Sequence, residues 1–311
     1  MAIETLSLFQ EPWWLDIVAP DEWKEVKVER NGEILAAWKF VLRKRYGLRW
    51  ITMPPFTPHL GPVLSLSAEK RESRASQEME FLEELVTRLP KFDYFNQRLF
   101  PSYQNWLPFF WHGFRQSTLY TYCFPKDDLS DLDQVWRELK ESTRRQIRKA
   151  GKKVEIQQSD DSFALIQMIR HTFARKNFEY KINEEMISAL IKECLIRRAG
   201  KILLAKDEQK NIHAGIFVVW DRNTLYYLLG GADDKFRSSG AMSLLLWNAI
   251  RLASEKKLRF DFEGSMVKGV ERFFRGFGAH RQPYFKIYKT NGFLANMAYW
   301  WIERRERAIK S

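Results

Sequence analysis

The sequence predicts an α/β (α+β) fold with two domains in tandem. The chain has 311 residues, which is long enough for two hydrophobic cores of ordinary size. Hydrophobic residues make up 45% and charged residues 29%, a globular composition. Both halves contain a meander of strands next to amphipathic helices, and this mixed order argues against an all-helical fold.

The first half opens its meander with a hairpin. Two strand-like segments, 23–30 and 34–45, flank Asn31-Gly32, a strong signal for a two-residue turn. A third strand is expected around 48–53. The second half repeats this plan with apolar segments at 201–207, 212–220 and 225–231, separated by turns at 208–211 and 221–224. We therefore expect a mixed, mostly antiparallel sheet flanked by helices in each half.

A helix is predicted between the halves, from Leu129 to Lys149. Its apolar stripe recurs at helical spacing and consists of Leu132, Val135, Trp136, Leu139, Thr143 and Ile147. Its last turns are basic and include Arg144 and Arg148. One interpretation is a solvated face whose cations complement the carboxyl end of the helix. The other is an anion-binding edge that contacts substrate through these two arginines.

The segment 225–278 is the most informative part of the chain. It predicts a buried strand, a Ser/Gly turn, an amphipathic helix, a second buried strand and an aromatic-glycine loop. A turn that opens a helix leaves backbone N–H groups beside the positive end of the helix dipole, where phosphate groups bind. The residues that we predict to bind a phosphate-bearing ligand at this turn are Arg237, Ser238, Ser239, Gly240 and Ala241. The alternative is a plain helix start capped by serine.

Composition also limits the partners. The formal net charge of +12 favours polyanions such as nucleic acid, phosphorylated metabolites or an anionic membrane. The two cysteines and five histidines show no metal-ligand spacing, so we predict no metal site. No apolar run reaches the length of a signal peptide or a bilayer span, and we expect a cytoplasmic protein. The aromatic-then-basic segment 297–310 either packs on its own domain or lies on a membrane surface.

Four segments together resemble the FemABX-like family of tandem GNAT-fold acyltransferases and peptidyltransferases. They are Trp111–Phe124, Ser142–Ile156, the strand end FDFEGS and the loop FFRGFGA, and Arg237-x-x-Gly240-x-Met242 resembles the acyl-donor turn of GNAT enzymes. The resemblance implies domains at 1–150 and 151–291 with a cleft between them. It also implies that a terminal helix, 292–311, packs back on the first domain.

The resemblance transfers to this chain residue by residue. Arg175 matches an arginine used for substrate contact, and Phe273 matches the phenylalanine that precedes a lysine implicated in catalysis. Here that lysine is replaced by Phe274, and the nearest cation is Arg275. Arginine stays protonated, so it can bind a substrate oxyanion or phosphate but cannot shuttle a proton.

Acyl transfer also needs a base and a hydrogen-bond donor for the oxyanion. Asp261 and Glu263 lie two residues apart on a strand and share a face, so either could be the base. The alternative for Asp261 is a hydrogen bond to the turn that follows. Tyr226 and Tyr227 alternate faces, so that one contacts substrate in the cleft while the other packs inward. We assign Tyr227 to catalysis and Tyr226 to substrate binding.

The predicted function is that of an N-acyltransferase acting on an amine of a cell-envelope or metabolite precursor. The resemblance implies acyl-CoA, acyl carrier protein or aminoacyl-tRNA as the donor substrate, with no tightly bound cofactor. One alternative is a FemABX-type peptidyltransferase of peptidoglycan cross-bridges that uses aminoacyl-tRNA. Another is a non-catalytic module that binds nucleic acid or membrane through its basic residues. The oligomeric state is left open.

Overall fold

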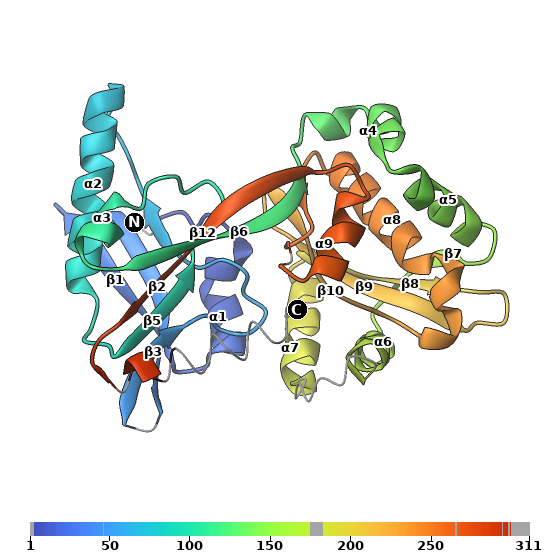
Figure 1. Cartoon of the computed structure of the whole chain (residues 1–311), viewed down its shortest axis with the longest axis horizontal. Helices are drawn as coiled ribbons and strands as arrows, with labels where there is room; N and C mark the ends of the chain where they lie inside the picture. The colour runs from blue at the N-terminus through green and yellow to red at the C-terminus, as the bar shows by residue number, and fades with distance from the viewer. Residues whose placement is uncertain are drawn as a thin grey trace. The chain divides into compact units, whose positions relative to one another are not determined.

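The computed structural model describes residues 3–45, 47–174, 183–264, 266–293, 295–297 and 299. The chain forms two compact units. The first combines residues 1–120 with 282–311, and the second consists of residues 121–281. Figure 1 shows strands and helices in both units.

The unit boundary differs from the predicted one at residue 150. Residues 121–150 belong to the second unit because their apolar side chains, including Val135 and Ile147, join its core. Residues 282–290 belong to the first unit, since strand β12 (His280–Thr290) pairs antiparallel with β5 (Tyr94–Arg98) there. Sequence patterns of single elements do not report such long-range pairing.

The first unit has the strand order β1-β2-β3-β5-β12, with β4 paired to β2. Its remaining strands are β1 (Trp23–Arg30), β2 (Glu33–Arg45), β3 (Leu48–Thr52) and β4 (Pro62–Leu64). The predicted hairpin is confirmed: Arg30 pairs with Glu33 around Asn31 and Gly32, whose φ angles are 52° and 77°. Two consecutive positive φ angles are what a tight hairpin turn requires.

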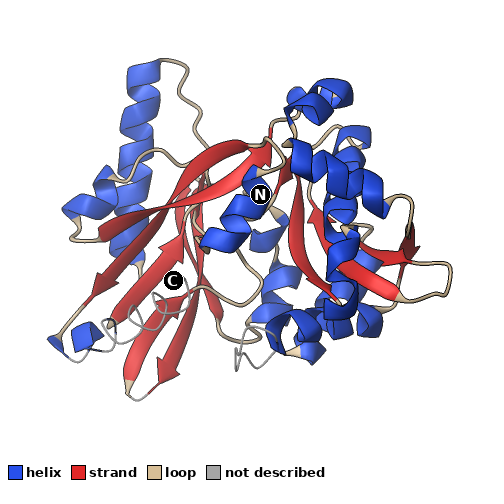
Figure 2. Ribbon diagram, turned by 45° about the vertical axis from the view of Figure 1, so that its right-hand side comes forward, coloured by secondary structure: helices blue, strands red, loops and turns tan. Residues whose placement is uncertain are grey.

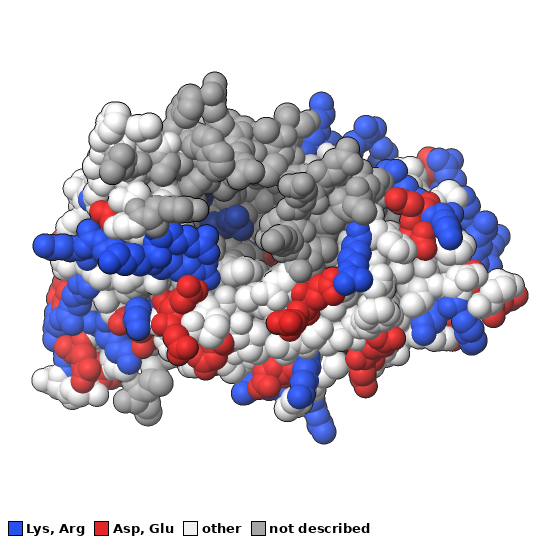
Figure 3. Space-filling view, turned by 90° about the horizontal axis from the view of Figure 1, so that it is seen from below, with Lys and Arg blue, Asp and Glu red and all other residues white. Residues whose placement is uncertain are grey.

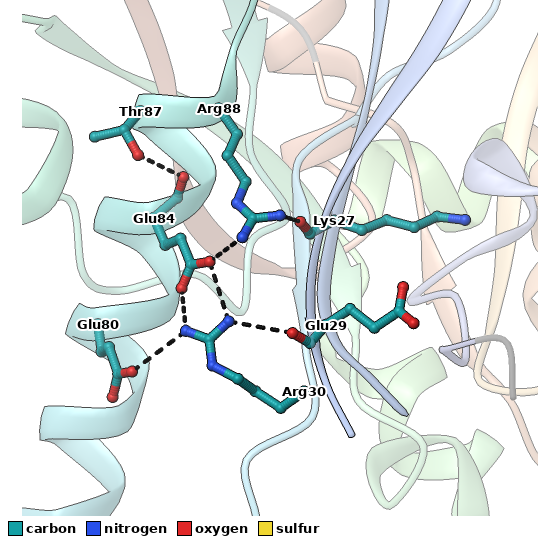
Figure 4. Close-up of polar contacts among 7 residues, drawn as sticks. All are labelled: Lys27, Glu29, Arg30, Glu80, Glu84, Thr87 and Arg88. Atoms are coloured by element: carbon teal, nitrogen blue, oxygen red, sulfur yellow. Dashed lines mark hydrogen bonds and ion pairs between the residues drawn. The ribbon is translucent and has the colours of Figure 1, made fainter. Parts of the chain in front are cut away.

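The helices of the first unit are α1 (Pro12–Val18), α2 (Arg71–Arg88) and α3 (Leu107–Trp111), with a short 3-10 helix at Leu8–Gln10. Apolar side chains of α2 join a core that includes Trp38 and Phe95. Ion pairs also fix α2 on β1: Glu84 binds both Arg30 and Arg88, and Arg88 donates to the carbonyl of Lys27 at 2.6 Å (Figure 4).

The second unit has the strand order β6-β11-β10-β9-β8-β7, and of β6 it contains the end from Thr121 onward. These strands are β6 (Arg115–Phe124), β7 (Glu155–Ser159), β8 (Gly200–Lys206), β9 (Ile212–Trp220), β10 (Thr224–Ala232) and β11 (Arg259–Asp261). Only β10 and β11 pair in parallel, which confirms a mixed, mostly antiparallel sheet. Figure 2 shows the strands of both units in red, with helices against them.

Helices cover both faces of this sheet (Figure 1). One face carries α4 (Leu132–Glu138), α5 (Glu141–Ala150), α8 (Ala241–Glu255) and α9 (Lys268–Arg275), with 3-10 helices at Asp128–Ser130 and Asp234–Ser239. The other face carries α6 (Ser162–Ala174) and α7 (Glu184–Ile196).

Two expectations for helices were wrong in detail. The single helix predicted from Leu129 to Lys149 is broken at Leu139 and Lys140, where Leu139 is buried and the N–H of Lys140 donates to the carbonyl of Gly276 at 2.9 Å. The predicted aromatic-glycine loop contains a helix, α9, because Phe274 and its neighbours bury an apolar face. Gly276 and Gly278 then lie in the turn that follows α9.

Most of the predicted terminal helix, 292–311, lies outside the described residues. Within the described part, the ring of Tyr299 stacks on that of Tyr288, with centroids 5.1 Å apart, and lies 6.0 Å from that of Tyr94. Both contacts lie in the first unit. Among the described helices, none is both long and apolar enough to cross a membrane.

Candidate active site

Strands β10 and β11 diverge after three residue pairs. Thr224, Leu225 and Tyr226 pair with Arg259, Phe260 and Asp261, and there β11 ends. Strand β10 continues to Ala232, paired on its other side with β9, and a bulge between Tyr227 and Leu229 bends it. Bulges of this kind often lie next to active sites. The divergence leaves the edge of β10 from Tyr227 onward unpaired with β11.

Gly240 connects this strand end to α8. Its φ is +83°, a left-handed conformation that favours glycine, and a Cβ there would lie 2.6 Å from the carbonyl oxygen of Gln146 on α5. Ser243 of α8 also donates to the side chain of Gln146 at 2.8 Å. The amino end of α8 is therefore fixed against α5, and only glycine fits between them.

The structure divides the predicted donor-binding residues into two groups. Ser239 and Ala241 are buried, and the Ser239 hydroxyl accepts the N–H of Ala241 at 3.2 Å. That amide is capped inside the protein, as the plain helix-start interpretation expected. Arg237 and Ser238 are exposed. The exposed half of the turn, together with the first turn of α8, is the part that can face an anion.

Lys149 adds positive charge to this turn. Its ammonium group donates to the carbonyl of Ser238 at 2.7 Å. It belongs to the basic end of the helix predicted from the sequence, but we did not single it out as a binding residue. Only the packing of α5 against α8 places it there, and no sequence signal distinguishes it from Lys152 or Lys153.

Arg144 and Arg148, by contrast, make contacts within their own unit. Arg144 donates to the carbonyl of Arg137 at 3.2 Å, and the guanidinium of Arg148 lies 5.6 Å from the ring centre of Trp136. These contacts favour a structural role, and substrate binding by either arginine stays a prediction. The face drawn in Figure 3 carries both acidic and basic residues, and basic ones adjoin in a band at its left end.

Asp261 is 2% exposed and has three donors around its carboxylate. The Thr121 hydroxyl and the N–H of Glu263 donate to one oxygen, and Arg259 donates to the other at 3.1 Å. Burial raises the pKa of Asp261, although Arg259 and these hydrogen bonds oppose the shift. A carboxylate that already accepts hydrogen bonds from three donors is better suited to holding the end of the strand in place than to acting as a general base.

Glu263 follows two residues later with a left-handed backbone, φ +63°, and its side chain is half-buried. A non-glycine residue in this region is strained, and strain of this kind clusters at functional sites. Glu263 lies close enough to Tyr226 to help raise the pKa of that hydroxyl. The strain fits the predicted catalytic role of Glu263, which the structure leaves as a prediction.

The two tyrosines of β10 have different surroundings, as their alternation predicts. Tyr226 is buried and its hydroxyl donates to Asp221 at 3.2 Å. Tyr227 lies on the opposite face, half-buried, with its ring 6.0 Å from that of Phe274. Its hydroxyl lies over Gly230, where an added Cβ would be 2.4 Å away. Burial raises the pKa of Tyr227, so its hydroxyl stays protonated and can donate a hydrogen bond.

The remaining predicted residues lie on α9 or outside the described part. Arg275 donates to Glu271 at 2.9 Å, and Glu271 also accepts the hydroxyl of Tyr122 at 2.6 Å, which lowers the pKa of Glu271. The positive charge of Arg275 is thus paired with Glu271 on the same helix. Phe273 is half-buried against Phe277, with ring centres 5.5 Å apart. Arg175 falls outside the described residues. No metal-ligand cluster occurs among the residues described.

Comparisons with known proteins agree with this geometry. Residues 137–275 match the family described as acetyltransferase (GNAT) domain. No curated protein matches the sequence. Among solved structures, FemX superposes with a TM-score of 0.65 at 13% identity, covering 89% of this chain and 91% of FemX.

Two further structures are similar over most of their length. The C-terminal domain of a putative lysylphosphatidylglycerol synthetase from Agrobacterium fabrum gives a TM-score of 0.53 at 12% identity, covering 92% of both chains. L-PGS from Bacillus licheniformis gives 0.51 at 13% identity, covering 85% of this chain and 83% of that one. At these identities the likeness concerns the fold.

The matched residues contain the diverging strands, the turn at Gly240 and helix α8, so the chain carries a GNAT acyltransferase domain. The likeness to FemX and the two synthetases extends over both units. Residues 137–275 therefore match the GNAT acetyltransferase domain, and the fold of the chain resembles that of FemX.

Proposed function

We propose that the protein is an N-acyltransferase that transfers an acyl or aminoacyl group to an amine of a cell-envelope or metabolite precursor. The observation that carries this is the divergence of β10 from β11 next to the turn at Gly240. This arrangement combines an unpaired strand edge with the positive end of a helix. An anionic donor would place its phosphate at the turn and its acyl group along the edge of β10.

In the proposed reaction the amine nitrogen attacks the acyl carbonyl, and the carbon–sulfur or carbon–oxygen bond to the carrier breaks. Tyr227 donates a hydrogen bond to the oxyanion or to the leaving group, because burial keeps its hydroxyl protonated. Glu263 accepts the proton that the amine loses. Asp261 holds the end of β11 through its bonds to Thr121 and Arg259.

The donor is anionic in each version of this proposal. Acyl-CoA fits the GNAT family match, and Lys149 and Arg237 beside the turn suit any phosphate-bearing carrier. Aminoacyl-tRNA is the second candidate, because the run from Arg144 to Lys153 extends the positive charge beyond the turn. In that case the protein is a FemABX-type aminoacyl-tRNA-dependent peptidyltransferase.

Isothermal titration with acetyl-CoA, acetylated acyl carrier protein and charged tRNA tests which of these donors the protein binds. We expect saturable binding of one donor and its loss in Gly240→Asp. Tight tRNA binding without heat from acetyl-CoA would reverse the order. Binding of RNA that weakens steeply with salt, without turnover of any donor, would instead support a non-catalytic module.

A further inference from the structure

Helix α3 exposes three large apolar side chains on one face. Leu107, Phe110 and Trp111 are 48%, 55% and 58% exposed. Their spacing of three and four residues places them side by side on a helix. The opposite face is anchored, since Phe109 is fully buried with its ring 5.6 Å from that of Trp38. We refer to Leu107, Phe110 and Trp111 as the α3 patch.

Several contacts hold the α3 patch in place. The side chain of Asn105 accepts the N–H of Leu107 at 3.1 Å, and the rings of Trp106 and Phe110 are 5.3 Å apart. At the other end of the helix, Lys289 donates to the carbonyl of His112 at 2.6 Å. Helix α3 also lies beside α2 (Figure 1). The apolar side chains are therefore presented by a fixed scaffold and need little ordering when they bind.

The chain around the patch lacks acidic residues. From residue 94 to residue 126 the sequence contains no Asp or Glu, and it carries an exposed cation at Arg115. Lys289 brings a second cation to the end of α3. Helix α2, beside α3, carries acids as well as arginines; among the acids, Glu78 bonds Asn105, and burial raises its pKa. Arg115 and Lys289 thus place two cations next to the carboxyl end of α3.

We propose that the α3 patch inserts into the surface of an anionic phospholipid bilayer. Aromatic side chains with adjacent cations suit the boundary between headgroups and acyl chains. The size of the patch argues against a stable protein partner or a second copy. Three side chains of this kind cover at most about 750 Å² when fully exposed, and here each is only about half exposed, whereas a stable interface buries about 800 Å² on each partner.

Vesicle flotation tests the proposal with the whole protein. We expect binding to vesicles with 40% phosphatidylglycerol and little binding to pure phosphatidylcholine, because the flanking cations contribute to affinity. In the double variant Phe110→Ser and Trp111→Ser, the partition coefficient should fall about tenfold or more. The matched control is Phe163→Ser on α6, which removes a 65%-exposed aromatic elsewhere and should bind vesicles like wild type.

A site-specific probe separates insertion from loss of folding. Both native cysteines are buried, with the pKa of Cys123 raised to about 11 and that of Cys194 to about 12. A maleimide dye will therefore label Phe110→Cys selectively in the folded protein. We expect a blue shift of the dye on adding anionic vesicles. No shift, equal binding by the double variant, or patch-dependent self-association in sedimentation velocity would each overturn the proposal.

Discussion

The hydroxyl of Tyr227 occupies the space that a side chain at Gly230 would need. A Cβ at Gly230 would lie 2.4 Å from that oxygen, so the glycine lets the tyrosine lie along β10 beyond the bulge. The ring is supported by Phe274 on α9. Strand β10 therefore directs one protonated hydroxyl toward the part of its length that β11 does not cover.

Tyr227→Phe removes this hydroxyl without changing the fold. If it donates to the oxyanion or the leaving group, kcat falls about 100-fold while donor affinity is unchanged. Single-turnover assays and titration of the donor measure the two quantities. Tyr226→Phe is the control: it loses the bond to Asp221 and about 1 kcal/mol of stability but keeps its kcat. Equal kcat for both variants would remove Tyr227 from the mechanism.

Gly240→Ala should weaken donor binding by displacing the amino end of α8. The new Cβ meets the carbonyl of Gln146, and its φ of +83° costs roughly 1 kcal/mol for alanine. Chemical denaturation and donor titration check both effects. Gly269→Ala, where a Cβ meets nothing within 4 Å, should leave binding unchanged and keep or slightly raise stability, because Gly269 lies in helix α9. Normal donor affinity in Gly240→Ala would show that the turn is not the donor site.

Asp261→Asn tests the structural role of the buried carboxylate. It replaces one of the two carboxyl oxygens, which accept from Thr121 and Arg259, with an NH2 group and should lower the free energy of unfolding by about 2 kcal/mol. Because burial raises the folded pKa, the folded state holds this proton more tightly than the unfolded chain, whose pKa is about 3.9.

The stabilising contribution of that proton is full below the unfolded pKa and is lost as the pH rises through the folded pKa. The deficit of Asp261→Asn relative to wild type should therefore be larger at pH 4 than at pH 7, as measured by urea denaturation at each pH. A large loss of kcat with unchanged stability would instead return Asp261 to catalysis.

Lys149→Ala removes the cation that contacts the turn at Ser238. We expect donor affinity to fall about fivefold, a loss of about 1 kcal/mol, with a shallower dependence on salt. Lys152→Ala removes an exposed cation from the same basic run and is the matched control. If both variants lose affinity equally, general positive charge explains the binding and the specific contact does not.

Local patterns predicted most of the elements correctly. Asn31-Gly32 and the alternating strands around it fixed the hairpin, and the segment 225–261 gave the strand, helix and strand in their observed order. These features depend on neighbouring residues. The break at Lys140 depends on Gly276, and the membership of β12 in the first unit depends on β5, so neither could be read from local periodicity.

The same distinction applies to the candidate site. The turn at Gly240 and its capping by Ser239 were predicted from local residue types, but the position of Lys149 follows from how α5 packs on α8. One of the hydrogen-bond donors to the Asp261 carboxylate is Thr121, which lies 140 residues away in the sequence. Hydrogen-bond partners at that separation leave no mark in the spacing of a single sequence.

Hydrogen–deuterium exchange with and without a saturating acyl donor tests the central claim most directly. If a negatively charged carrier binds where α8 begins, backbone amides from Phe236 to Leu244 should exchange more slowly in the complex, together with those of β10 beyond Tyr227. A donor that binds at saturation and protects other segments, leaving these amides at their free rates, would contradict the account.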